Sequence, residues 1–195
     1  CSGKDSLFTI ENNKLKLTIS TRGGRMYSAV LKDYTAYNSL PVKLFSGDST
    51  VFCYKFFSSD NKAINTNDLY FTPVTSVNNI VVKDKPESIV MRLPASQGGY
   101  IEYTYTLYPD NYMIDFGTKF VSLSDVVESN ISNITLDWKM FIPQQEKGRQ
   151  NEEMYTGLKY KIYQDDVENL SQRQRKDAVS KNLMKLDWIA FQDQF

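Results

Sequence analysis

Alternating apolar and polar positions near the start of the chain predict an antiparallel hairpin. Between Lys14 and Ser20, apolar residues alternate with polar ones, and this period of two places the apolar side chains on one face of a strand. Gly23 and Gly24 then interrupt the pattern, and a glycine pair supplies the positive φ angles of a tight turn. An apolar run resumes at residues 26–31. The stretch therefore predicts strand, turn and strand, with one buried face.

Two further hairpins are predicted downstream. Residues 100–107 and 112–121 flank a strong turn signal, Pro-Asp-Asn, at residues 109–111. Residues 80–82 and 88–93 flank a charged segment that contains a proline, which is also typical of a turn. Each pair is therefore expected to form adjacent antiparallel strands.

Shorter alternating runs predict additional strands. They lie at residues 7–10, 42–45, 51–57, 69–77, 134–142, 158–163 and 183–191. Leu136 and Trp138 fall on one face of their run, whereas Glu102 and Lys159 are expected at exposed positions. Many short strands punctuated by turns are typical of an antiparallel sandwich. The fold class is therefore predicted to be mostly all-β, with little helix.

Polar stretches separate these runs. Residues 1–6 are predicted to be a disordered start, and residues 58–68 and 144–153 to be exposed loops. Residues 165–182 lack a sustained apolar stripe and leave room only for a short helix. No linker rich in proline or glycine divides the chain, so residues 1–195 are expected to form a single domain.

Composition excludes several classes of chemistry. The 195 residues contain no histidine, which excludes a histidine general base, a histidine-containing triad and a histidine-ligated metal. Cys1 and Cys53 are too few for a zinc site or a disulfide framework, and Cys53, in an apolar run, is expected to be a buried free thiol. A net charge of zero gives no argument for nucleic acid, and no apolar run is long enough to span a bilayer. We expect no enzyme activity, no catalytic or metal-binding residue and no cofactor.

Other candidate chemistry is more simply explained by a solvated surface. The pairs Glu152-Glu153 and Asp165-Asp166 lie in polar segments, and neighbours in a strand point to opposite faces, so a catalytic pair is not indicated. Acidic residues flank the basic cluster of Arg173, Arg175 and Lys176, so a lipid or phosphate site is not favoured. Asn-x-Ser/Thr sequences at Asn130, Asn133 and Asn169 occur at about the frequency that chance predicts.

Tyrosines offer two interpretations. They are either the ordinary filling of a half-buried sheet, which we favour, or the lining of a groove for sugar or peptide. The candidates are Tyr27, Tyr34, Tyr37, Tyr54, Tyr100, Tyr103, Tyr105, Tyr108 and Tyr112.

Two end motifs and one hairpin carry a resemblance to a known family. The motif L-x-L-T-I-S-T-R-G-G spans Leu15–Gly24, and D-W-I-A-F-Q-D-Q-F spans Asp187–Phe195. Between them the hairpin of residues 103–120 has Tyr-Pro-Asp-Asn-Tyr at its turn. This order resembles the large periplasmic domain of YidC-type membrane protein insertases, and the asparagine- and tyrosine-rich style is similar to Bacteroidetes members.

The resemblance implies a fold, a location and partners. The fold would be an antiparallel β-supersandwich like that of galactose mutarotases, although the catalytic histidine of those enzymes has no counterpart here. The domain would lie in the periplasm, held at the inner membrane by parts of a longer protein, which fits the abrupt start and stop of the chain. It would be a docking or spacing module that contacts auxiliary subunits of the Sec translocon and nascent membrane proteins. No residue of the insertase groove is present, so no active site is carried over.

An alternative interpretation belongs to a different class. Cys1-Ser2-Gly3 resembles the start of a mature lipidated chain, although a cloning junction explains Cys1 equally well. The chain would then be a carbohydrate- or peptide-binding β-sandwich module of a surface lipoprotein.

Overall fold

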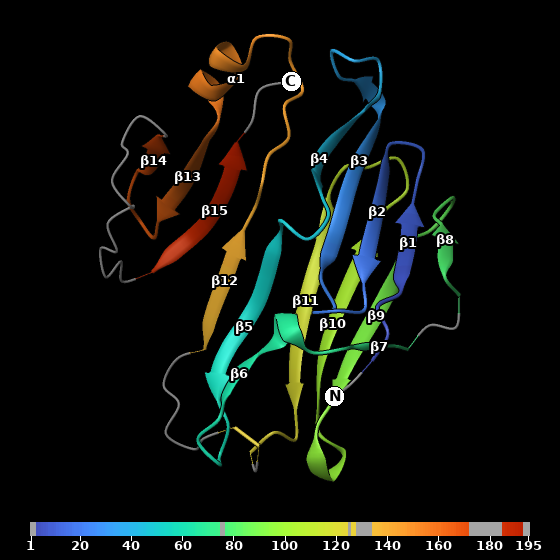
Figure 1. The fold of residues 1–195 in the computed structure, drawn as a ribbon, viewed down its shortest axis with the longest axis vertical. Helices are drawn as coiled ribbons and strands as arrows, with labels where there is room; N and C mark the ends of the chain where they lie inside the picture. The colour runs from blue at the N-terminus through green and yellow to red at the C-terminus, as the bar shows by residue number, and fades with distance from the viewer. Residues whose placement is uncertain (1–2, 75–76, 125, 128–133, 172–184, 193–195) are drawn as a thin grey trace. The chain divides into compact units, whose positions relative to one another are not determined.

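A computed structural model describes residues 3–74, 77–124, 126–127, 134–171 and 185–192. Contacts between Cα atoms divide the chain into two compact units (Figure 1). Unit 1 comprises Cys1–Tyr34 and Pro41–Phe141, and unit 2 comprises Thr35–Leu40 and Ile142–Phe195. The expectation of a single domain over residues 1–195 stays a prediction.

The first sheet of unit 1 contains the predicted hairpin around the glycine pair. Its strand order is β4 (Pro41–Ser46), β3 (Met26–Thr35), β2 (Leu15–Ser20), β1 (Leu7–Glu11) and β8 (Asn79–Val81). β1 pairs with β2 and β2 with β3, both antiparallel, as the alternation predicts. β8 instead joins β1 in parallel, so the predicted hairpin of residues 80–82 with 88–93 is wrong. The edge of β1 supplies hydrogen bonds to this segment, as in the bond from the Val82 N–H to the Glu11 carbonyl oxygen (2.7 Å).

The second sheet contains the other predicted hairpin. Its strand order is β11 (Ile114–Val121), β10 (Tyr100–Leu107), β9 (Glu87–Pro94) and β7 (Thr72–Pro73). β10 and β11 pair over their whole length, which confirms the hairpin predicted around the Pro-Asp-Asn turn. Among the described residues of the stretch 69–77, the one strand is β7, and Pro73 at its end cannot donate a hydrogen bond to a longer ladder.

A third sheet of unit 1 combines distant segments. Its order is β12 (Thr135–Lys139), β5 (Val51–Phe57) and β6 (Ala63–Asn65), followed by the short 3₁₀ helix η1 (Thr66–Asp68). The exposed loop predicted for residues 58–68 is present at residues 59–62, but it is wrong for the rest, where β6 and η1 form. Thr66 is fully buried, and its hydroxyl is satisfied there, because it accepts a hydrogen bond from the Tyr54 N–H (3.0 Å) and bonds the Tyr103 hydroxyl (3.2 Å).

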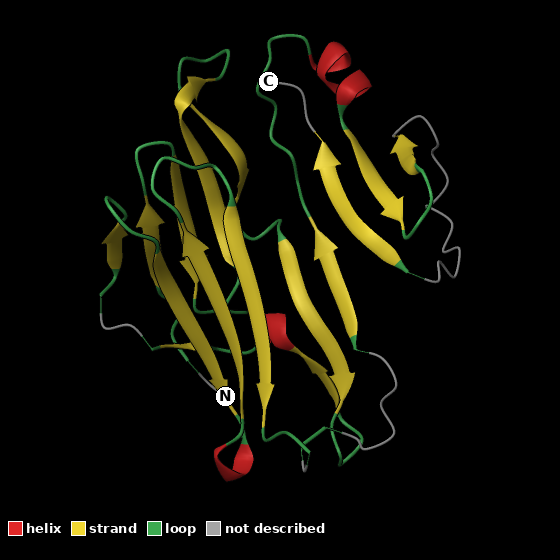
Figure 2. Cartoon of the chain, turned by 180° about the vertical axis from the view of Figure 1, so that it is seen from behind, coloured by secondary structure: helices red, strands yellow, loops and turns green. Residues whose placement is uncertain are grey.

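Apolar faces of the first two sheets supply most of the core of unit 1. The largest fully buried apolar side chains are Ile10, Leu15, Leu17, Ile19, Ile89, Met91, Tyr103, Tyr105 and Leu107. Buried Asn12, at the turn between β1 and β2, donates to the carbonyl oxygens of Tyr108 (2.8 Å) and Asn111 (2.7 Å) beyond β10. These bonds tie the turns of the two sheets together, and Figure 2 shows the strands from behind. The predicted mostly all-β antiparallel sandwich with little helix is confirmed.

The glycine pair has a specific packing role. Gly23 and Gly24 have φ angles of 78° and 60°, which glycine adopts with little strain. The Gly24 carbonyl oxygen accepts a hydrogen bond from the buried Tyr105 hydroxyl (2.7 Å). A Cβ atom at Gly24 would lie 2.7 Å from the ring of Phe71. The turn therefore needs glycine both for its backbone angles and for its close approach to the core.

The start of the described chain is hydrogen-bonded to this turn. Within the stretch predicted to be disordered, the Asp5 carboxylate accepts from the Ser20 hydroxyl (2.7 Å), and the Ser6 N–H donates to the Thr21 hydroxyl (2.9 Å). Residues 1–2 lie outside the described residues.

Unit 2 contains one small sheet and one helix. The sheet order is β14 (Val167–Ser171), β13 (Gly157–Ile162) and β15 (Leu186–Gln192), all antiparallel. The helix α1 (Arg149–Tyr155) lies partly inside residues 144–153, so the exposed loop predicted there is wrong. Its Glu152 carboxylate is buried and accepts from the Gln145 N–H (2.7 Å), which closes the segment on itself. β14 occupies part of residues 165–182, where only a short helix was considered.

Candidate binding surface

Aromatic side chains of β5, β11 and β12 meet on one face within unit 1. Phe52 of β5 contacts Phe116 of β11 and Trp138 of β12, with ring centroids 5.0 and 5.9 Å apart. Tyr54 and Phe120 are 5.5 Å apart. Cross-strand register explains the grouping, because Trp138 lies opposite Phe52 and Leu136 opposite Tyr54, and opposite residues share a face. We call this set the aromatic strip; it comprises Phe52, Tyr54, Phe116, Phe120, Leu136 and Trp138.

The aromatic strip runs from the core to the solvent. Phe52 is buried, and Tyr54, Phe116 and Trp138 are half-buried. Phe120 and Leu136 expose 36% and 43% of their surface. The strip therefore presents apolar side chains to the solvent at its margin.

Two strand edges border the strip. β11 ends its sheet and β12 ends another, so each has one edge with no neighbouring strand among the described residues. Figures 1 and 2 both show β5 beside β11, in agreement with the ring contacts. Unpaired backbone groups of an edge strand can hydrogen-bond an additional extended segment. The strip therefore combines apolar contact with backbone hydrogen-bonding capacity.

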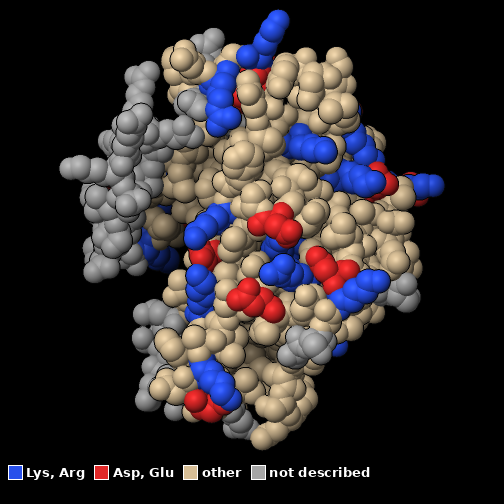
Figure 3. All heavy atoms as spheres, viewed as in Figure 1, with Lys and Arg blue, Asp and Glu red and all other residues tan. Residues whose placement is uncertain are grey.

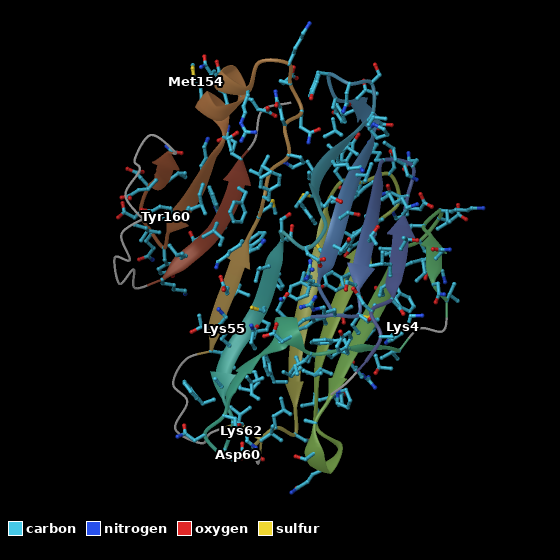
Figure 4. The ribbon with its side chains drawn as sticks, in the orientation of Figure 1. Lys4, Lys55, Asp60, Lys62, Met154 and Tyr160 are labelled. Carbon is cyan, nitrogen blue, oxygen red and sulfur yellow. The ribbon has the colours of Figure 1, made fainter. Side chains whose placement is uncertain are left out.

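Ion pairs occupy the opposite faces of the same strands. The Lys55 ammonium, labelled in Figure 4, donates to Asp137 (2.7 Å) and thereby holds the pKa of that carboxyl below its ordinary value. Glu102, expected at an exposed position, is instead buried between Arg92 (2.7 Å) and Lys119 (3.3 Å). Positive and negative side chains are mixed on the face that Figure 3 shows. The strip is therefore apolar, whereas the surface around it carries both positive and negative side chains.

A small apolar pocket lies at one end of the strip. Its volume is about 150 Å³, and Phe56, Leu93, Ile101 and Leu123 form its buried walls. Phe56 lies two residues beyond Tyr54 on β5, and Ile101 pairs with Phe120. The polar side chain among its lining residues is Ser96 of the 3₁₀ helix η2 (Ser96–Gly98). The pocket is therefore suited to an apolar group.

The tyrosines proposed as a groove lining do not converge. Tyr103 and Tyr105 are buried in the core, and burial raises the pKa of the Tyr105 hydroxyl well above its ordinary value. The ring centroids of Tyr34 and Tyr112 are 6.1 Å apart, and Cζ of Arg92 lies 4.4 Å from the centroid of the Tyr100 ring. The favoured interpretation, filling of the sheets, agrees with these positions. Tyr54 alone belongs to the aromatic strip.

The other candidate side chains have varied positions. Glu152 is buried and holds the Gln145 N–H, so its assignment to the solvated surface is wrong. Asp165 and Asp166 are exposed, as expected. Asn169 is exposed on β14. The basic cluster and the first two Asn-x-Ser/Thr sites lie outside the described residues; they are Asn130, Asn133, Arg173, Arg175 and Lys176.

The described residues include one buried cysteine and no group of side chains that could bind a metal ion. Cys53 is a buried free cysteine, as expected, and burial raises the pKa of its thiol. Among the described residues, no group of cysteine, aspartate and glutamate side chains could hold a metal ion. Nor does any helix described here have the length and apolarity needed to cross a membrane.

The sequence alone did not predict which strands pair to form this surface. Alternation placed Leu136 and Trp138 on one face, but it could not show that this face adjoins β5, about eighty positions earlier in the chain. It also missed buried Arg25, whose guanidinium pairs with Asp48 at 2.8 Å. Local patterns carry no signal for either pairing, because the partners are distant in sequence.

Comparison with known proteins agrees with the architecture. The family model described as "YidC periplasmic domain" matches residues 7–195. The "Membrane protein insertase YidC" of Azobacteroides pseudotrichonymphae is 38% identical over 193 residues, covering 99% of this chain and 30% of that protein. The protein of the same name from Parabacteroides distasonis is 37% identical, covering 99% of this chain and 29% of that protein.

A more distant relative shows the same coverage. The "Membrane protein insertase YidC" of Porphyromonas gingivalis is 30% identical over 195 residues, covering 100% of this chain and 30% of that protein. The chain thus spans less than a third of the length of these relatives. They are Bacteroidetes proteins, as the asparagine- and tyrosine-rich sequence predicted. The match over nearly the whole chain and the antiparallel sheets lead to one conclusion: the chain belongs to the family of YidC periplasmic domains.

Proposed function

We propose that the chain is a non-catalytic docking and spacing module of a membrane protein insertase. It works on the periplasmic side of the inner membrane, anchored there by other parts of a longer protein. It supports the insertion and folding of membrane proteins by contacting them and auxiliary subunits of the Sec translocon. The relatives of the chain that are named "Membrane protein insertase YidC" support this assignment.

The aromatic strip is the observation that carries the docking role. Phe120 and Leu136 are exposed next to the free edges of β11 and β12, whereas the other faces of these strands bear ion pairs. Burying such apolar surface stabilises a complex by about 25 cal/mol per Å² removed from water, before the cost of ordering the partners. A partner with apolar surface therefore gains binding free energy by covering Phe120 and Leu136.

Three features support the absence of catalysis. The chain has no histidine, so a histidine base is excluded. Its buried Cys53 has a raised thiol pKa, which disfavours the reactive thiolate at neutral pH. Glu102 and Asp137, two carboxylates with lowered pKa values, are each held by a neighbouring cation in a structural ion pair.

A photocrosslinking experiment in the full-length parent protein tests the docking role. A photoreactive amino acid is placed at Leu136, and in a matched control at Thr135, the neighbouring position on β12 that faces the other way. We expect adducts with a nascent membrane protein or a Sec subunit from position 136 and few from position 135. Equal adducts at both positions, or none at either while insertion proceeds, would contradict a role for the strip.

A further inference from the structure

We propose that a cavity at one edge of unit 1 binds a small organic acid, a carboxylate with a compact apolar body. The cavity lies between the start of the described chain and residues 70–73, and it opens to the solvent. No residue of the aromatic strip lines it. The inference therefore goes beyond the proposed docking function and does not rest on it.

The two walls of this cavity are attached to one buried residue, Thr21. On one side, the Ser6 N–H donates to the Thr21 hydroxyl (2.9 Å), and the Thr21 N–H donates to the Ser6 carbonyl oxygen (3.0 Å). On the other side, the Phe71 N–H donates to the Thr21 carbonyl oxygen (2.8 Å). A Cβ atom at Gly3 would lie 2.6 Å from Cβ of Tyr70, so the walls also approach closely there. These contacts preform the cavity, and a preformed site loses less conformational freedom on binding.

The volume and the apolar lining of the cavity suit the body of a small molecule. Its volume is about 470 Å³, which lies in the range of small-molecule sites. Phe8 and Phe71, both buried members of the core, line it together with Pro73 and Pro94. An apolar group gains free energy when it displaces water from such side chains. A compact apolar body, such as a phenyl ring, is therefore the part of the ligand expected against them.

The charge of the lining determines the sign of the ligand. Among the described residues that line the cavity, one carries a charge, the exposed cation Lys4 (Figure 4). Its ammonium has no ion pair with any carboxylate in the described part of the chain. The carboxylate of the adjacent Asp5 instead accepts from the Ser20 hydroxyl (2.7 Å) and the Arg22 N–H (3.3 Å). Lys4 can therefore pair with an anionic ligand, whereas a cationic ligand meets only repulsion.

A carboxylate fits this lining better than a phosphate. One ammonium balances the single negative charge of a carboxylate, whereas a phosphate ester carries about 1.5–2 negative charges at pH 7. Ser6 and Thr72 are exposed lining residues, and their hydroxyl groups can donate to the two carboxylate oxygens. The ligand class is therefore a monocarboxylic acid with an apolar body.

The first test titrates benzoate into the isotopically labelled chain of residues 1–195 at low salt, with NMR as the readout. We expect saturable shifts of the backbone amides of Ser6, Thr21 and Thr72, and contacts from the benzoate ring protons to the Phe8 side chain. Benzylamine, which has the same ring and the opposite charge, should bind at least about three-fold more weakly. Absence of saturable shifts with benzoate would overturn the site, and equal affinity for the two probes would overturn its preference for an acid.

A pair of lysine variants tests the charge. Lys4→Gln should weaken benzoate binding by about three-fold and should not weaken benzylamine binding, because it removes the one cation among the described lining residues. Lys16→Gln makes the same change at an exposed position of β2 outside the lining and should leave both affinities unchanged. Unchanged benzoate affinity in Lys4→Gln would overturn the assignment of the cavity to an acid.

A pair of threonine variants tests the volume. Thr72→Phe adds a ring at a lining position and should abolish the saturable benzoate shifts, because the new side chain occupies the space of the ligand. Thr135→Phe makes the same change at an exposed position of β12 outside the lining and should leave the shifts intact. Undiminished binding to a folded Thr72→Phe variant would overturn the site. If that variant does not fold, the ring-proton contacts to Phe8 in the unsubstituted chain decide instead.

Discussion

Two strands of this chain have similar alternation but very different surroundings. In β10 of unit 1, Tyr103 and Tyr105 are 0% exposed, whereas in β15 of unit 2, Trp188 and Ile189 are 43% and 38% exposed. β10 pairs on both sides, with β9 and β11, and β15 pairs only with β13 among the described strands. Alternation therefore indicates that a segment is a strand, but the packing of its faces against other parts of the chain decides how deeply it is buried.

The difference predicts where stability resides. A fully buried aromatic side chain makes contacts all around its ring, and removing it leaves a cavity. A half-exposed side chain on an edge strand loses only part of that contact when it is truncated. Substitutions in β10 should therefore destabilise the chain much more than matched substitutions in β15.

Truncation of a core aromatic is expected to have the largest effect. Tyr105→Ala in β10 should lower the free energy of unfolding by about 3–5 kcal/mol, because it removes a buried ring. Trp188→Ala in β15 should cost less than about 1.5 kcal/mol, since the ring is partly solvated. Urea denaturation followed by circular dichroism measures both. Equal losses would break the comparison between the two strands.

Glycine substitutions sharpen the comparison at two turns with similar backbone angles. Gly24→Ala should cost about 2–4 kcal/mol, because the left-handed conformation strains alanine and the new Cβ meets the Phe71 ring at 2.7 Å. Gly98 has a φ angle of 78°, but no atom lies within 4 Å of the Cβ that alanine would add there. Gly98→Ala should therefore cost only the backbone strain, about 1–2 kcal/mol. Thermal unfolding of both variants should separate packing from conformation.

Removal of a single hydroxyl tests the polar contact in the core. Tyr105→Phe leaves the Gly24 carbonyl oxygen without its donor and should cost about 1–3 kcal/mol. Tyr155→Phe, at an exposed position of α1, should change stability by less than about 0.5 kcal/mol. A neutral Tyr105→Phe variant would show that the buried carbonyl finds another donor.

The smallest expected effect concerns pH. The hydrogen bond from Arg92 lowers the pKa of Glu102 below its ordinary value of 4.5. A carboxyl with a lowered pKa in the folded state contributes stability above that ordinary value, and the contribution is lost as the pH falls through the folded-state pKa. At acidic pH, the free energy of unfolding falls as Glu102 is protonated. Glu102→Gln should therefore reduce that fall below pH of about 4.5 by about 0.5–1 kcal/mol. Arg92→Gln should reduce the same fall when the free energy of unfolding is measured against pH. An unchanged fall at acidic pH in both variants would contradict the role of the ion pair.

Local patterns were most reliable where hydrogen-bond partners are close in sequence. The hairpins of β2 with β3 and of β10 with β11 form as predicted, because short turns join adjacent strands. The hairpin expected for β8 and β9 does not form, because each strand finds a better partner elsewhere. Residues 58–68 and 144–153 look polar in sequence, yet Thr66 and Glu152 are buried through hydrogen bonds that no local pattern reveals.

The sequence by itself determined the strand-rich class, the glycine turn, the lack of histidine chemistry and the resemblance to a family. Each of these depends on residue type or on neighbours within a few positions. Only the tertiary structure decided which apolar faces are buried, and it brought β12 beside β5 to form the aromatic strip. The physical reason is that strand pairing and layer packing depend on contacts between distant segments, and many pairings satisfy the same alternation until the whole core is assembled.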